Sequence, residues 1–135
     1  MNIGRTNIWV GLSVMAFFMA YGFLLIWLRD FAPGKEEWIA AYSTGKHFES
    51  RLAHVHGNLI ALTNILFGYL MLKLPVSGPL AKPASWLALA GLMMPLGILG
   101  EVYLGLSPIF VLAGAASIVA ATVLLALAIA RPAAA

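Results

Sequence analysis

The three histidines of the chain lie together in the segment HFESRLAHVHGN, at positions 47–58. Imidazole nitrogens bind metals and exchange protons near neutral pH, and the apolar run LIALTNILFGYLMLKL begins directly after this segment. An ionisable residue inside an apolar span is by default a candidate for function, because lipid offers it no partner. We therefore interpret at least one of His54 and His56 as a ligand or a catalytic group. His47 and Glu49, further from the apolar run, are equally well explained as interfacial residues.

A helix over residues 47–67, turning 100° per residue, would divide the polar side chains of this segment between two faces. One stripe holds His47, Arg51, His54 and Asn58, and the nearly opposite stripe holds Glu49, His56 and Thr63. Side chains two positions apart point in different directions, so His54 and His56 are not expected to bind one metal ion. Polar groups on both faces also require protein or water around this end of the helix.

Four further polar residues are candidates for the same site. Asn58 and Asn64 are expected either to act in the site or to bond one helix to another. Glu101 and Tyr103 lie at one end of a later apolar segment, where Glu101 is expected either to reach water or to be turned inward by a bend at Pro95. Tyr103 fits an interfacial aromatic as well as a proton donor. Counting membrane crossings places Glu101 and Tyr103 on the same side as the histidines, so one pocket containing His54, Asn58 and Tyr103 is predicted.

The elements that must position these residues are membrane helices. The chain of 135 residues is 62% hydrophobic and 10% charged, whereas soluble domains carry about 25% charged residues. Helices need roughly 20 apolar residues to cross a bilayer, and four segments qualify: 8–28, 52–72, 86–104 and 109–130. We predict an all-α membrane protein, a single domain over residues 1–135 with four transmembrane helices in one bundle. The first connection, through KEEWIAAYS, is predicted to form a short interfacial helix.

Charge distribution bears on partners and orientation. The basic residues are spread along the chain, which favours membrane topology over nucleic-acid binding. Lysine and arginine divide evenly between the two sides: Arg5, Lys73, Lys82 and Arg131 against Arg29, Lys35, Lys46 and Arg51. The first side holds both termini and no acidic residue, so we assign the termini to the cytoplasm. The first span is expected to be retained, because its apolar run is too long for a secretory signal.

The residue types narrow the choice of cofactor. The chain has no cysteine, which excludes thiolate and iron–sulfur sites, and its spans hold too few carboxylates for a hard-cation site. A zinc site needs three or four ligands, which two histidines facing apart and Glu101 supply poorly. Haem needs one proximal histidine and an apolar slot between helices, which this chain can supply, although such apolar stripes more often form plain core or a lipid face.

The stretch SRLAHVHGNLIALTNILFGYLM resembles the second membrane helix of a group of small four-helix membrane isomerases that includes styrene oxide isomerase. Those proteins carry an Arg-Ala-His element followed by glycine and asparagine, and GEVYLGLSP is similar to their glycine, tyrosine and Ser-Pro pattern. Ala53, His54 and Gly57 match the Ala-His-x-x-Gly element of hydroxylaminobenzene mutase. The run HVHGNL also resembles the His-x-His-x-Asn-Leu of small oxidase-subunit-like membrane proteins.

The resemblance implies that His54 is the axial ligand of a b-type haem held between the subunits of a trimer, with Tyr103 positioning the substrate oxygen. Two departures affect the site. The asparagine of the group lies six residues after its histidine, where this chain has Ile60, so Asn58 or Asn64 would take its place. Arg51 is one residue further from His54 than the pattern requires.

The implied reaction is a rearrangement of a small, membrane-soluble aromatic substrate without net redox change. Haem iron acts as a Lewis acid on the substrate oxygen, and an epoxide becomes an aldehyde or hydroxylaminobenzene becomes an aminophenol. The expected location is a bacterial inner membrane. The alternative is a haem-binding electron-transfer or oxidase-accessory subunit, which a second axial ligand would favour. In either case the cofactor-binding residues are sought among Arg51, His54 and His56.

Overall fold

The computed structural model describes residues 3–74, 76 and 79–130, and every regular element within them is a helix. The helices are α1 (Ile3–Asp30), α2 (Lys35–Ala40), α3 (Gly45–Lys73), α4 (Ala81–Ala90), α5 (Met93–Leu104) and α6 (Ile109–Ala130). The prediction of an all-α protein is confirmed. The short helix expected in the first connection is α2.

Four helical stretches are long and apolar enough to cross a membrane: Ile3–Asp30, Gly45–Lys73, Ala81–Leu104 and Ile109–Ala130. Their number matches the prediction, and the chain is compatible with an integral membrane protein. The second stretch begins at Gly45, upstream of the apolar boundary at residue 52 that hydropathy indicates. Because α3 continues through the polar segment, all three histidines lie on one regular helix.

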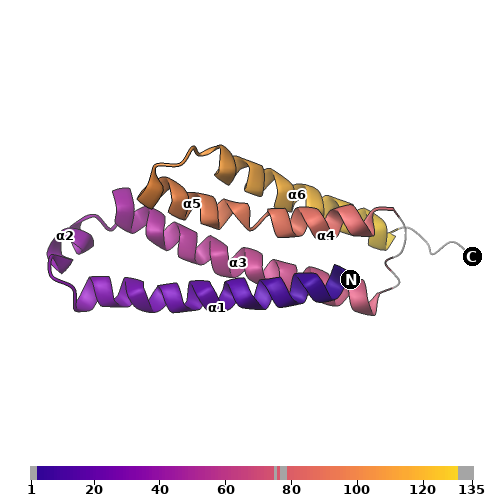
Figure 1. Ribbon diagram of the computed structural model, residues 1–135, viewed down its shortest axis with the longest axis horizontal. Coiled ribbons are helices and arrows are strands. Elements are labelled where there is room, and N and C mark those ends of the chain that lie inside the picture. Colours follow the sequence, from indigo (N-terminus) through magenta and orange to yellow (C-terminus); the bar gives the residue numbers. More distant parts are fainter. Residues whose placement is uncertain (1–2, 75, 77–78, 131–135) are drawn as a thin grey trace, which may run out of the picture.

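The helices form two layers that are joined through α3 (Figure 1). Helix α1 packs along α3, α5 packs on both α3 and α6, and α4 packs on α6. The beginning of α1 and the end of α6 lie at one end of the bundle, whereas α2 and the α5–α6 turn lie at the other. The beginning of α3, with its histidines, is at the α2 end.

The third membrane-length stretch is interrupted between α4 and α5, where Pro95 removes a backbone donor. Pro95 has no N–H to bond the carbonyl of Gly91, and that carbonyl instead accepts from the amide of Met94 at 3.0 Å. The amide of Leu92 likewise bonds the carbonyl of Leu89 at 3.1 Å. These three-residue bonds tighten the helix locally. The bend expected from Pro95 therefore takes the form of a break just before it.

Small residues allow α1 and α3 to approach closely. A Cβ added to Gly68 would lie 2.3 Å from the carbonyl oxygen of Gly4, and one added to Gly57 would lie 2.3 Å from the ring of Phe18. Phe18 is fully buried there with Ala53. Membrane helices commonly associate in this way, because lipid provides no hydrophobic force between them.

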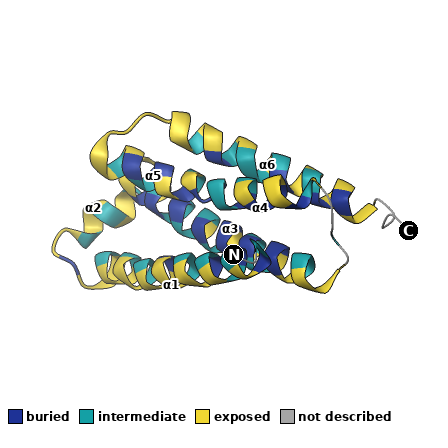
Figure 2. Cartoon of the chain, turned by 45° about the vertical axis from the view of Figure 1, so that its right-hand side comes forward, coloured by how far each residue is buried: buried dark blue, intermediate teal, exposed yellow. Residues whose placement is uncertain are grey.

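The outer faces of α1 and α6 are apolar and exposed, as the burial colouring in Figure 2 shows. Trp9, Phe23 and Trp27 on α1 and Leu112 and Val119 on α6 are each about half exposed or more. Large apolar side chains on the outside and small or polar ones inside suit a lipid environment.

Candidate functional site

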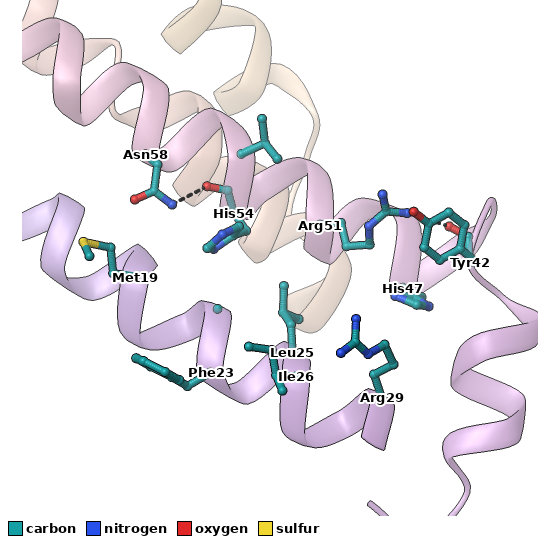
Figure 3. A pocket seen from close by; sticks show the side chains of 12 residues that line it. Met19, Phe23, Leu25, Ile26, Arg29, Tyr42, His47, Arg51, His54 and Asn58 are labelled. Carbon is teal, nitrogen blue, oxygen red and sulfur yellow. Dashed lines mark hydrogen bonds between the residues drawn. The ribbon is translucent and has the colours of Figure 1, made fainter. Parts of the chain in front are cut away.

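A groove of about 780 Å³ runs between α1 and α3, and Tyr42 lies at one end of it (Figure 3). Small-molecule and cofactor sites usually occupy about 300–1,000 Å³. The groove is lined by Met19, Gly22, Phe23, Leu25, Ile26, Arg29, Tyr42, His47, Arg51, His54, Val55 and Asn58. The whole predicted polar stripe of α3 faces this groove, and the α1 wall is apolar apart from Arg29.

His54 lies in the groove with a defined tautomer and orientation. Its Nδ1 is 2.8 Å from the carbonyl oxygen of Phe18 on α1. A carbonyl only accepts hydrogen bonds, so Nδ1 carries the proton and Nε2 presents a lone pair when the ring is neutral. Among the described residues no hydrogen bond involves Nε2. Histidines that ligate metals are held in this way, with one nitrogen bonded to a carbonyl and the other free for the metal.

Gly22 makes room for this histidine. A Cβ at position 22 would lie 2.7 Å from Cε1 of His54, a distance that real side chains do not tolerate. The glycine therefore lets the imidazole rest against the backbone of α1, where it reaches the carbonyl of Phe18. The orientation of His54 depends on α1 as much as on its own helix.

Asn58 lies one turn beyond His54 and also lines the groove. Its Nδ2 donates to the carbonyl of His54 at 2.9 Å, as the dashed line in Figure 3 shows. Its Oδ1 accepts no hydrogen bond from the described residues. The groove therefore contains a fixed imidazole and an amide oxygen in neighbouring turns of one helix.

Aromatic side chains of the first connection hold the outer end of the groove. The imidazole of His47 stacks on Trp38, with ring centroids 4.5 Å apart, and meets the edge of Tyr42 at 5.3 Å. Its Nδ1 donates to the carbonyl of Trp38, and the side chain is buried. His47 thus anchors the α2 segment to α3. This structural role was not predicted from the sequence, which favoured an interfacial position for His47 as much as a place in the site.

His56 lies outside the groove. Its Nδ1 is 2.9 Å from the carbonyl of Leu52, one turn earlier on the same helix, and it is not among the lining residues. Of the two candidate ligands, only His54 reaches the groove. The two imidazole rings point to different sides of α3, as expected for residues two positions apart on a helix.

Asn64 belongs to a buried network between α1, α3 and α4, near the other end of the bundle. Its Oδ1 accepts from Asn7 at 2.9 Å, and its Nδ2 donates to the carbonyls of Ile60 and Ala88 at 3.0 and 2.8 Å. Ser85 donates to the amide oxygen of Asn7. The amide of Asn64 is thus used in bonding helix to helix, which was one of the two roles expected of it.

Tyr103 and Glu101 do not line the groove. The hydroxyl of Tyr103 lies 2.8 Å from that of Ser50 and 3.2 Å from that of Tyr21, in a cluster that joins α5, α3 and α1. Glu101 is exposed. Tyr103 is at the same end of the bundle as the histidines, but the expected single pocket with His54 and Asn58 does not form. The groove and the hydroxyl cluster are separate.

Several residues that shape the site were not predicted from the sequence. Gly22 and the carbonyl of Phe18 orient His54, and Ser50 and Tyr21 hold Tyr103. A glycine or a tyrosine in the middle of an apolar span is a signal for close helix contact or internal hydrogen bonding. Neither signal identifies the partner residue.

The residues of the groove fit a haem better than a metal held by several side chains. Among the described residues, no three histidine, aspartate or glutamate side chains come together as a metal-binding group. His54 instead offers one oriented imidazole beside apolar walls, and Arg51 and Arg29 line the same groove. A haem site requires a nitrogen ligand of this kind and an apolar slot, and an arginine beside them can bind a carboxylate.

The three comparisons with known proteins give no family for the chain. No protein-family model, curated protein or solved structure matches it. The resemblance to small four-helix isomerases remains a prediction from short motifs, and the function must be argued from the groove itself.

Proposed function

We propose that the chain is an integral membrane isomerase that rearranges a small aromatic substrate in the α1–α3 groove, with a b-type haem bound through His54. The substrate would be an epoxide that becomes an aldehyde, or a hydroxylaminobenzene that becomes an aminophenol. The observation that carries this proposal is the orientation of His54. Its Nδ1–H is bonded to the Phe18 carbonyl, and the ring lines an apolar groove.

The bound haem would supply a Lewis acid that weakens the C–O or N–O bond of the substrate. The chain would supply the surroundings. Phe23, Ile26 and Val55 give the groove apolar walls, which keep water from trapping a developing cation, so that rearrangement competes with hydrolysis. Asn58 has an amide oxygen available to bind a substrate N–H or O–H group. The hydrogen bond from His54 to the Phe18 carbonyl keeps Nε2 available for the iron.

Electron transfer is the competing function, and the groove favours it less. A second axial ligand, histidine or methionine, would be needed to keep the iron closed to substrate. His47, the second histidine of the groove, stacks on Trp38 and bonds its carbonyl. His47 and His54 are seven residues apart on one helix, or about 10 Å along its axis. They therefore cannot bind opposite faces of one iron.

The cellular setting follows from composition and resemblance. We place the protein in a bacterial inner membrane with its termini in the cytoplasm, surrounded by lipid that also carries the hydrophobic substrate. A homo-oligomer, a trimer by resemblance, would cover part of the exposed apolar surface. Reporter fusions after Leu28 and after Leu72 should give opposite signals, and matching signals would contradict four crossings.

The proposal is tested by incubating haem-loaded protein in detergent with a small aromatic epoxide or an arylhydroxylamine, without nicotinamide, flavin or oxygen. The expected result is the isomer as the product, identified by chromatography. His54→Ala supplied with the same amount of haem is the control for haem free in the detergent. Haem-loaded protein that turns over neither substrate class would contradict the isomerase function and favour electron transfer.

A further inference from the structure

The charged side chains of the groove lie at one end, and the other end is apolar apart from the neutral amide of Asn58. Arg29, Tyr42 and Arg51 lie at the α2 end, whereas Met19 and Phe23 lie at the far end (Figure 3). His54 is located between them. A ligand that fills this space is therefore expected to have a polar end and an apolar body, and to bind in one direction.

Arg51 is held at the polar end with most of its hydrogen-bonding capacity available. Its guanidinium lies 3.7 Å from the centroid of the Tyr42 ring, and one nitrogen donates to the Tyr42 carbonyl at 3.3 Å. A guanidinium has five N–H donors, and this is the one bond that Arg51 makes to the described residues. The ring and the carbonyl fix its position without neutralising its charge.

No carboxylate of the described residues neutralises Arg51. Arg29, the other cation of the groove, is paired with Asp30 at 2.7 Å. The nearby charges of Glu37 and Lys46 line a smaller neighbouring pocket instead. The groove therefore keeps one uncompensated positive charge beside apolar walls. An anionic group would be favoured there, because a charge in such surroundings is stabilised by a partner of opposite sign.

We propose that Arg51 forms a carboxylate subsite that binds a propionate group of the cofactor and sets the direction in which the cofactor enters the groove. This inference rests on the proposed function, because it takes haem as the occupant. Arginine suits the task, since its planar fork binds a carboxylate through two parallel hydrogen bonds. The apolar part of the ligand then lies toward Met19, past the imidazole of His54.

The test compares haem with its dimethyl ester, in which both propionates are neutral. Each is titrated into the apo-protein in nanodiscs of neutral lipid, and affinity is read from the Soret absorbance. Wild type should bind the ester about 10- to 100-fold more weakly than haem, the range expected for charge-assisted hydrogen bonds. Arg51→Met should lower the affinity for haem by a similar factor and leave the affinity for the ester unchanged.

Lys46→Met is the matched control, because it removes one positive charge from α3 outside the groove. It should preserve the preference of wild type for haem. Equal affinity of wild type for haem and ester would overturn the carboxylate subsite while leaving the proposed function standing. Equal losses for both ligands in Arg51→Met would also overturn it, because the effect of Arg51 on binding would then not depend on the propionate charges. If wild type binds neither ligand, the proposed function fails together with the subsite.

Discussion

Gly22→Ala tests whether α1 holds His54 in the geometry of a metal ligand. The added Cβ would lie 2.7 Å from Cε1 of the imidazole, whereas ordinary contacts begin at 3.4 Å. The ring must therefore move by about 0.7 Å, which stretches the 2.8 Å bond from Nδ1 to the Phe18 carbonyl to as much as about 3.5 Å, beyond hydrogen-bonding range. Loss of such an orienting bond commonly lowers metal affinity about 10- to 100-fold.

The assay is a titration of apo-protein with haem, followed by absorbance, for wild type, Gly22→Ala and Ala20→Val. Ala20→Val adds bulk at an exposed position on the same helix outside the groove, so it should bind haem as wild type does. The thermal unfolding midpoint of each variant shows whether the α1–α3 contact survives. If Gly22→Ala binds haem with wild-type affinity and an unchanged spectrum, the contact of His54 with α1 is not needed for His54 to bind haem.

Four further substitutions separate the other candidate residues. Asn64→Leu should lower the free energy of unfolding by about 1–2 kcal/mol, because it leaves buried polar partners unpaired. Asn58→Leu should lower it less. Equal thermal unfolding of the two variants would contradict a stabilising role of the hydrogen-bond network around Asn64. Tyr103→Phe should leave haem affinity unchanged, because Tyr103 lies outside the groove. A fall in turnover of 10-fold or more, measured by product formation, would support a role of Tyr103 in orienting the substrate oxygen. His56→Ala should keep the Soret band of wild type. Loss of the band would show that the proposed ligand, His54, is the wrong histidine.

The fold was largely predictable because lipid imposes a simple rule on sequence. Apolar runs of membrane length must become helices that satisfy their own backbone groups, so four of them predicted four spans. The groove-facing stripe of α3 was predictable for a similar reason. Residues 47, 51, 54 and 58 share a face on any regular helix, whatever packs against it.

The composition of the site was less predictable, because it depends on rotations about the helix axes. Counting crossings gave the correct end of the bundle for Tyr103 but no information on its angle around the bundle axis. Its hydroxyl bonds Ser50 and Tyr21 instead of facing the groove. Asn64 likewise required partners in α1 and in the last turn of α4, and no local pattern connects it with Asn7 or Ala88. Contacts between residues far apart in sequence decided both positions.

Haem binding through His54 is the central claim, and a single comparison tests it most directly. Purified wild type and His54→Ala are each mixed with one equivalent of haem in nanodiscs, freed of unbound haem by gel filtration, and examined by visible absorption. The account predicts a Soret band that elutes with wild type and is lost in His54→Ala, with both proteins folded to the same helix content by circular dichroism. A wild-type protein that elutes without haem, or a His54→Ala variant that retains the same band, would contradict it.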